Sequence, residues 1–208
     1  MKVLELPFEE RLTPFSTPSS YDSFRTFSPS GTVPCLIDGG TAIWDSLAIT
    51  EYLHERHEGV WPADQAGRDW ARCAAAEIHA GFSTLRSICG MNCGIRVRLW
   101  DISLALQKDL DRLTELWNDG LSRFGGPFLA GGQFTAADAF FCPVAFRVQT
   151  YGLELGSNSA AYVERILGLV PMREWYGAAL AEKWREASHE EEVRAAGELT
   201  ADLRASPS

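Results

Sequence analysis

The sequence predicts an α/β unit followed by an all-helical unit. Up to about His57 the chain has short segments separated by Pro, Gly and Ser, whereas from Asp69 it has long stretches with helical spacing and few breaks. The change falls within the stretch EGVWPADQAG. We therefore expect an α/β unit over 1–58, a linker over 59–67 and a helical unit over 68–208.

A β-hairpin followed by a helix is the clearest pattern in the first unit. Val33–Ile37 is an apolar strand, the tripeptide DGG is a tight turn that tolerates positive φ, and Thr41–Trp44 is the return strand. Asp45 and Ser46 then stand where the N-cap of a helix belongs, and apolar residues at helical spacing continue to about His57. Two weaker elements are expected before the hairpin, a strand over Glu9–Phe15 and a short helix or turn over Tyr21–Phe27.

The second unit reads as a series of helices. They are expected over Arg68–Ile88, Arg98–Phe124, a segment opened by the capping box from Thr135 to Asp138, Ser159–Leu169, and Pro171 to about His189. Pro143 should bend the third of these helices. The run from His189 to Ser208 has almost no large apolar residues, so we interpret it as a solvated last helix that frays into a mobile acidic tail.

Composition and charge limit the partners. The chain has 208 residues, of which 46% are hydrophobic, enough to bury a sizeable core. Its net charge of -9 argues against nucleic acid and anionic membranes, because the average field repels both. No apolar run approaches the roughly 18 to 20 residues of a membrane helix, and no export signal is apparent at the N-terminus. We expect a cytoplasmic protein with no membrane partner.

The cysteines indicate neither disulfides nor a metal. Their number, five, is odd, and they lie in apolar surroundings in a chain without an export signal, so reduced thiols are expected. Cys89 and Cys93 lack the spacing of metal ligands, and with only His79 nearby they do not predict a zinc site. Cys35, inside an apolar strand, is interpreted as a core residue.

Several of these features, at their separations, resemble the cytosolic glutathione transferase family. They are the Val33-Pro34 pair, the hairpin, the segment WDSLAI and the cap TAAD that begins at Thr135. The resemblance spans nearly the whole chain, and the stretch AEIHAGFSTLRSICGMNCG is similar to a bacterial branch of the family. It implies a thioredoxin-like domain joined to an all-helical domain. It also implies transfer of glutathione, as co-substrate, to a small hydrophobic electrophile, or glutathione-dependent isomerisation.

Four residues are candidates for binding glutathione. A proline after a strand residue, at the rim of a sheet, is a setting for a cis peptide that turns backbone groups toward solvent. Val33, before Pro34, could then pair with an extended peptide, which the resemblance identifies as the cysteinyl part of glutathione. Ser46, at a helix start, offers its hydroxyl and backbone donors to a carboxylate, and Asp45 offers a countercharge to an ammonium. The alternative is an ordinary hairpin and helix cap.

Three residues are candidates for binding the second substrate. His79, Phe82 and Arg86 stand at i, i+3 and i+7 and would share one face of a single helix. In the resembled family the electrophile pocket lies against this helix. The alternative is that Phe82 packs in the core while the other two side chains make local hydrogen bonds.

No residue is assigned as catalytic. The resembled enzymes lower the pKa of the glutathione thiol with a hydrogen bond from a Tyr, Ser or Cys just after the first strand. In their pattern that strand and a helix precede the segment similar to LPFEE, and Met1–Leu4 reads as the last turn of that helix. We therefore expect an N-terminally truncated thioredoxin-like domain. Ser16, Tyr21 and Cys35 do not stand at the family's catalytic position.

Alternatives to an enzyme follow from that absence. The chain could be a non-catalytic binding or scaffold protein that keeps the two-domain shape, or a truncated remnant that folds only in its helical half. The resemblance also implies a homodimer, in which the α/β domain of one subunit faces the helical domain of the other.

Overall fold

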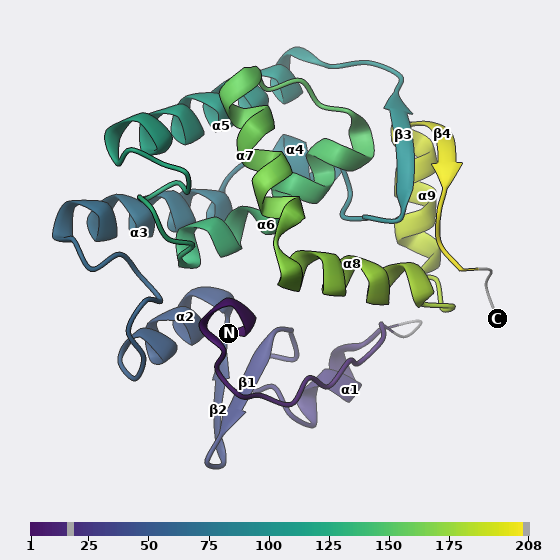
Figure 1. The fold of residues 1–208 in the computed structure, drawn as a ribbon. Helices are drawn as coiled ribbons and strands as arrows, with labels where there is room; N and C mark the ends of the chain where they lie inside the picture. Colours follow the sequence, from purple (N-terminus) through teal and green to yellow (C-terminus); the bar gives the residue numbers. More distant parts are fainter. Residues whose placement is uncertain (16–18, 206–208) are drawn as a thin grey trace.

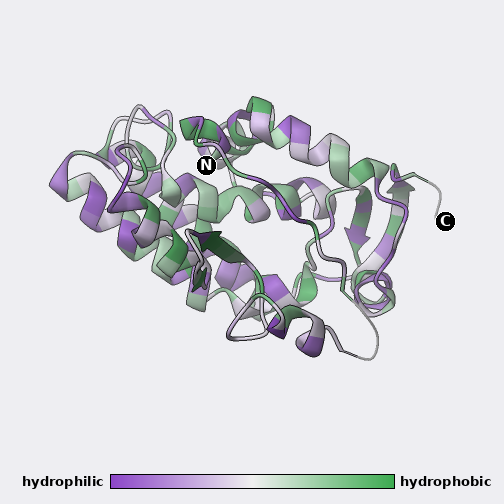
Figure 2. Ribbon diagram, turned by 90° about the horizontal axis from the view of Figure 1, so that it is seen from below, coloured by the Kyte–Doolittle hydropathy of each residue, from purple (hydrophilic) through white to green (hydrophobic). Residues whose placement is uncertain are grey.

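The computed structural model describes residues 1–15 and 19–205. A small unit containing β1, β2, α1 and α2 lies against a larger unit built from the remaining helices, as Figure 1 shows. The predicted architecture, an α/β unit followed by a helical unit, is thus confirmed. Figure 2, seen from below, shows hydrophobic and hydrophilic residues alternating along the longer helices, which is the amphipathic pattern that packing around a core requires.

The hairpin forms where it is expected. Strand β1 (Cys35–Asp38) pairs antiparallel with β2 (Thr41–Trp44), and Cys35 lies opposite Trp44. The turn between them uses Gly39 and Gly40 at φ values of 55° and 85°, a region that costs glycine little. Helix α1 (Tyr21–Arg25) precedes the hairpin, as predicted.

The strand expected over Glu9–Phe15 is not formed, and this prediction is wrong. Residues 9–15 are irregular, and a cavity of about 580 Å³ lies between residues 6–13 and β1. In the part of the chain that the structure describes, β1 pairs only with β2 and offers no backbone partner to this segment. A strand without a ladder of hydrogen bonds does not form. The first residues make a 3₁₀ turn, η1 (Lys2–Leu4).

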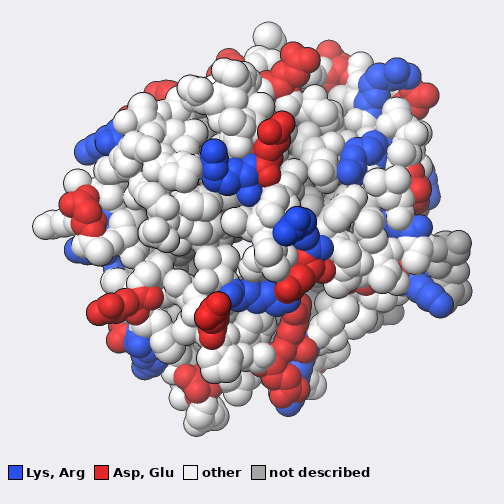
Figure 3. All heavy atoms as spheres, viewed as in Figure 1, with Lys and Arg blue, Asp and Glu red and all other residues white. Residues whose placement is uncertain are grey.

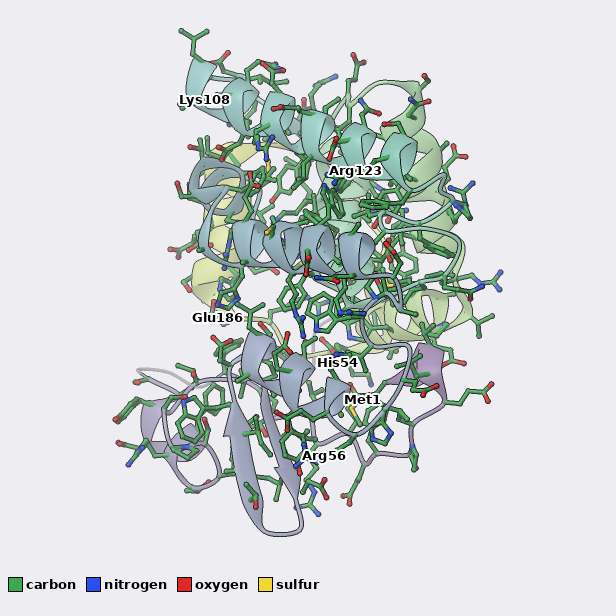
Figure 4. All side chains as sticks on the ribbon, turned by 90° about the vertical axis from the view of Figure 1, so that its left-hand side faces the viewer. Met1, His54, Arg56, Lys108, Arg123 and Glu186 are labelled. Atoms are coloured by element: carbon green, nitrogen blue, oxygen red, sulfur yellow. The ribbon has the colours of Figure 1, made fainter. Side chains whose placement is uncertain are left out.

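Helix α2 (Ser46–His54) joins the two units. Figure 4 shows it between the hairpin and the helical unit, with the labelled His54 near its end. On its inner side, the Glu51 carboxylate accepts hydrogen bonds from Arg72 at 2.8 and 3.0 Å and from Trp61 Nε1 at 2.9 Å. A small apolar cluster lies at the same boundary and contains Val60, Trp61, Ala71, Ala75, Ala136 and Ala137, with Leu47 and Leu53 against it.

The single helix expected over Arg68–Ile88 is two helices, α3 (Gln65–Ala80) and α4 (Ser83–Ile88). Between them Phe82 adopts a left-handed conformation, with φ 54° and ψ 40°. Arg86 Nη1 donates to the carbonyls of Ile78 and His79 at 3.4 and 2.8 Å, and so satisfies acceptors that the end of α3 leaves without helical partners. These contacts hold the start of α4 to the end of α3 across the break in the backbone.

The later helices agree with the sequence in part. They are α5 (Leu104–Arg123), α6 (Ala136–Tyr151), α7 (Ser157–Gly168), α8 (Val170–Ala181) and α9 (Ala187–Ala196). The capping box of α6 is confirmed. The helix expected from Pro171 to His189 is split between α8 and α9, because the Glu186 carboxylate caps a new helix by accepting from the N–H of His189 at 2.8 Å.

The C-terminal residues are ordered further than expected. Strand β4 (Gly197–Asp202) pairs antiparallel with β3 (Ile95–Leu99), so the predicted fraying tail is wrong over 197–202, and the helix predicted from Arg98 begins only at Leu104. In Figure 1 this pair stands at the side of the helical unit with α9 beside it. Ile95 and Val97 are buried, which anchors β3 to the core. Residues 206–208 of the predicted tail lie outside the described residues.

The core of the helical unit includes one buried acid. Asp138 accepts hydrogen bonds from the N–H groups of Leu129 and Thr135 at 3.0 and 2.9 Å and from the hydroxyl of Tyr162 at 3.0 Å. Burial raises the pKa of its carboxyl, and the hydrogen bonds that it accepts oppose that shift. Asp138 therefore ties the start of α6 to the loop before it and to α7.

Surface charge is distributed. On the face shown in Figure 3, Lys and Arg side chains alternate with Asp and Glu, so the net charge of -9 is not gathered into one patch there. In residues 1–15 and 19–205, no helix is both long and apolar enough to cross a membrane.

Candidate functional site

The hairpin register brings the four candidate glutathione residues to one end of the sheet. Because Cys35 lies opposite Trp44, the residues just before β1 and just after β2 are neighbours. These are Val33 and Pro34 on one side, and Asp45 and Ser46 on the other. The Val33-Pro34 peptide is cis, as expected, and the Val33 residue is 44% exposed.

Asp45 has an unusual backbone conformation. Its φ is 72° and its ψ is 133°, a region that residues other than glycine seldom occupy. Its Oδ1 accepts from the N–H of Leu47 at 2.8 Å and so caps α2, as predicted. Such conformations cost about 1 to 3 kcal/mol and cluster at functional sites, which favours a role beyond capping.

His79 links Asp45 and Ser46 to the helical unit. Its Nε2 lies 3.2 Å from Asp45 Oδ2, and its Nδ1 lies 3.4 Å from Ser46 Oγ. The ring also meets Phe140 of α6 edge to face, with 6.3 Å between the ring centroids. A residue predicted for the second substrate therefore contacts two residues predicted for glutathione.

A cavity of about 240 Å³ opens beside this group. Ser46, His79, Arg86 and Arg147 supply its polar lining. The apolar part of the wall comes from Ile78, Leu85, Met91, Phe140, Pro143 and Val144. Helices α2, α3, α4 and α6 all contribute, so the cavity lies where the two units meet.

Phe82 does not share a face with His79 and Arg86, so that prediction is corrected. The break between α3 and α4 turns its side chain into the main core, where the residue is 7% exposed. His79 and Arg86 still meet at the cavity, although they come from different helices. His79 and Arg86 therefore do lie together, because α3 and α4 meet at the cavity and not because of their spacing on a single helix.

Arg147 is the residue that sequence reasoning missed. Its Nε donates to the carbonyl of Cys89 at 2.7 Å, and its Nη1 donates to the carbonyl of Pro143 at 3.3 Å. Burial lowers the pKa of Arg147, and the nearby charge of Arg86 lowers it further. A signal was present, because Arg147 is the one ionised residue between Phe140 and Tyr151 in an otherwise mostly apolar helix.

Tyr21 and Cys35, which do not stand at the family's catalytic position, lie apart from this cavity. Tyr21 is 54% exposed on α1, and the thiol of Cys35 donates to the carbonyl of Phe27 at 3.5 Å. Neither lines the cavity. Ser16 lies outside the described residues.

No metal centre is found in the described ranges. No group of three or more His, Cys, Asp or Glu side chains is arranged to hold an ion among residues 1–15 and 19–205. Cys89 and Cys93 are buried free thiols, and burial raises the pKa of Cys89 to about 12.

Comparison with known families identifies the class of protein. The sequence model of the glutathione S-transferase N-terminal domain matches residues 1–56, and that of the C-terminal domain matches residues 68–178, more than half of the chain. The chain therefore belongs to the glutathione S-transferase family. Its two units are a thioredoxin-like domain and the helical domain of that family.

Relatives agree with this assignment. The chain is 38% identical over 61 residues to a dichloromethane dehalogenase of Methylorubrum extorquens, covering 28% of this chain and 21% of that one. It is 30% identical over 157 residues to a glutathione S-transferase of Arabidopsis thaliana, covering 68% and 61%. The chain thus spans less than two thirds of the length of either relative. A crystal structure of a glutathione transferase homolog from Burkholderia with bound glutathione has a TM-score of 0.61 at 23% identity, and covers 86% of each chain.

Proposed function

We propose that this protein is a glutathione-dependent transferase that adds the glutathione thiolate to a small electrophile, or that isomerises such a substrate. The observation that carries the proposal is the joining of Asp45 and Ser46, through His79, to the 240 Å³ cavity. Two adjacent binding places are what a reaction between two substrates requires, because holding both lowers the entropic barrier.

Glutathione would lie along the end of the hairpin. The carboxylate of its γ-glutamyl group would meet the Ser46 hydroxyl and the backbone donors that the start of α2 leaves without helical acceptors. The ammonium would lie against the Asp45 carboxylate, which already contacts His79 and Leu47 but can accept further hydrogen bonds. The backbone of Val33, before Pro34, would pair with the cysteinyl part.

The electrophile would occupy the cavity. Its apolar wall suits a hydrophobic body, and His79 and Arg86 supply polar contacts at the edge nearest α2, α3 and α4. Membership of the glutathione S-transferase family supports this arrangement of two neighbouring substrates.

The activity is tested by conjugation of glutathione to chlorodinitrobenzene. The proposal expects a rate above the uncatalysed one that saturates with glutathione. Ser46→Ala should raise the KM for glutathione about three- to tenfold, the worth of one hydrogen bond. Ser157→Ala is the matched control, because Ser157 is also the first residue of a helix and is exposed. A rate equal to the uncatalysed one would contradict the proposal and favour a non-catalytic binding protein.

We also propose that the protein is a cytoplasmic homodimer. Family membership supports both statements. The α/β domain of one subunit would face the helical domain of the other, so light scattering coupled to gel filtration should give twice the mass of one chain. A mass equal to that of one chain at micromolar concentration would exclude the dimer.

A further inference from the structure

Two guanidinium groups line the same small cavity. Arg86 comes from α4 and Arg147 from α6, and the two are close enough for the charge of one to disfavour the charge of the other. Arg147 is partly buried and Arg86 is exposed at the mouth of the cavity, and two like charges held close together repel unless something of opposite charge lies between them.

Neither guanidinium has a carboxylate partner. Arg147 donates to two backbone carbonyls and contacts the sulfur of Met91 at 3.8 Å, and Arg86 donates to the carbonyls of Ile78 and His79. Among the residues that the structure describes, no Asp or Glu oxygen lies within 4.0 Å of either group. Their positive charge is therefore held in place but not neutralised.

Several other arginines that pack between elements are neutralised. Arg72 lies 2.8 Å from a Glu51 oxygen, Arg112 lies 2.7 Å from Glu77, and Arg204 pairs with Asp202 at 2.7 Å. Arg96 and Arg185 likewise donate to backbone carbonyls and have no carboxylate within 4.0 Å among the described residues. What distinguishes Arg86 and Arg147 is that two such groups line one cavity.

The nearest ionisable groups do not form ion pairs with Arg86 or Arg147. Burial raises the pKa of the Cys89 thiol and of the Tyr151 hydroxyl, so both are neutral at ordinary pH. Glu192 lies beside Gly90 and Tyr151, and Asp45 is paired with His79. Among the described residues, neither of these two carboxylates lies within 4.0 Å of the Arg86 or Arg147 guanidinium.

We infer that Arg86 and Arg147 form a subsite for a carboxylate, and that the electrophile of this enzyme is a small anion. The inference rests on the proposed function and names its substrate class. Guanidinium groups bind carboxylates through paired N–H donors, and their positions here are fixed by backbone carbonyls before any ligand arrives. The cavity of about 240 Å³ has room for roughly eight waters, so the acid must be compact.

The inference separates two sources of a carboxylate. Glutathione itself carries carboxylates, and one of them could reach a guanidinium. The electrophile is the favoured source of the carboxylate. The starts of α2 and β1 already offer hydrogen-bond donors to glutathione, whereas the apolar wall next to Arg147 suits a hydrophobic acid.

The test compares binding of dinitrobenzoate with that of its neutral analogue dinitrobenzamide by titration calorimetry. Neither compound has a leaving group, so binding is measured without turnover. The wild-type protein should bind the acid at least about tenfold more tightly, the worth of one charge-assisted hydrogen bond. Arg147→Gln and Arg86→Gln should each remove most of this preference, and Arg147→Lys should keep part of it. Arg173→Gln, on the exposed side of α8, is the control and should leave the preference unchanged.

Two results would overturn the inference. One is equal affinity for acid and amide in the wild-type protein. The other is an acid preference that persists in Arg86→Gln, because a variant that still selects the acid has kept its fold. Loss of glutathione affinity in that variant with the acid preference intact would assign the guanidinium to glutathione, and would also overturn the inference. The acid and the amide are titrated both without and with glutathione. If glutathione itself does not bind, the proposed function fails, whereas the preference for acid over amide is still measured in the titrations without glutathione.

Discussion

Replacing Asp138 with alanine is expected to lower the free energy of unfolding by about 3 to 5 kcal/mol. The residue is fully buried and accepts hydrogen bonds from two backbone N–H groups, those of Leu129 and Thr135, and from the Tyr162 hydroxyl. Alanine would leave three donors in the core without partners, at about 1 to 3 kcal/mol each before relaxation. It would also loosen the start of α6, the helix that carries Arg147.

Urea unfolding followed by circular dichroism measures this effect. Asp138→Asn keeps an oxygen in place and should lose less stability than Asp138→Ala. Asp111→Ala is the matched control, because Asp111 is exposed on α5 and accepts a hydrogen bond from the exposed Gln107 side chain; its effect should stay within about 0.5 kcal/mol. If Asp138→Ala unfolds at the same urea concentration as Asp111→Ala, the buried network does not hold α6.

Replacing Asp45 with asparagine is expected to weaken glutathione binding by roughly ten- to a hundredfold, which corresponds to the loss of a charge-assisted hydrogen bond. Asparagine is as good an N-cap as aspartate and tolerates positive φ, so the bond from Leu47 and the start of α2 should remain. What the variant lacks is the negative charge that would face the glutathione ammonium. The effect on stability should therefore be small while the effect on affinity is large.

Features set by neighbouring residues could be predicted from the sequence. The turn at Gly39 and Gly40, the cap at Asp45 and the capping box at Thr135 each depend on a few adjacent side chains and formed as expected. The division into an α/β domain and a helical domain followed from the same local patterns. It needed no knowledge of how the domains meet.

Features set by distant contacts could not be predicted. The break between α3 and α4 depends on Arg86 reaching the last carbonyls of α3 and on Phe82 entering the core. The alternation in IRVRL was visible in the sequence, but its partner strand, Gly197–Asp202, lies far along the chain. The scarcity of large apolar residues in the acidic run from His189 to Ser208 made that partner look like a solvated tail.

The candidate site divides in the same way. Val33, Pro34, Asp45 and Ser46 are near one another in the sequence, and the hairpin register brings them together. Their role in binding glutathione stays a prediction. Arg147 stood out in the sequence as a lone ionised residue in an apolar helix, but its place beside Arg86 became clear only from the structure, where it donates to the carbonyl of Cys89 after α4.

The central claim is that glutathione binds at the start of α2, and titration calorimetry of glutathione into three proteins tests it most directly. The proteins are wild type, Asp45→Asn and Asp64→Asn. Asp64 is the matched control, because it caps α3 by accepting from the N–H of Gly67 at 2.8 Å and does not line the cavity. The account predicts equal affinities for wild type and Asp64→Asn, and an affinity lower by roughly ten- to a hundredfold for Asp45→Asn. Equal affinities in all three proteins, or no heat of binding in the wild type, would contradict it.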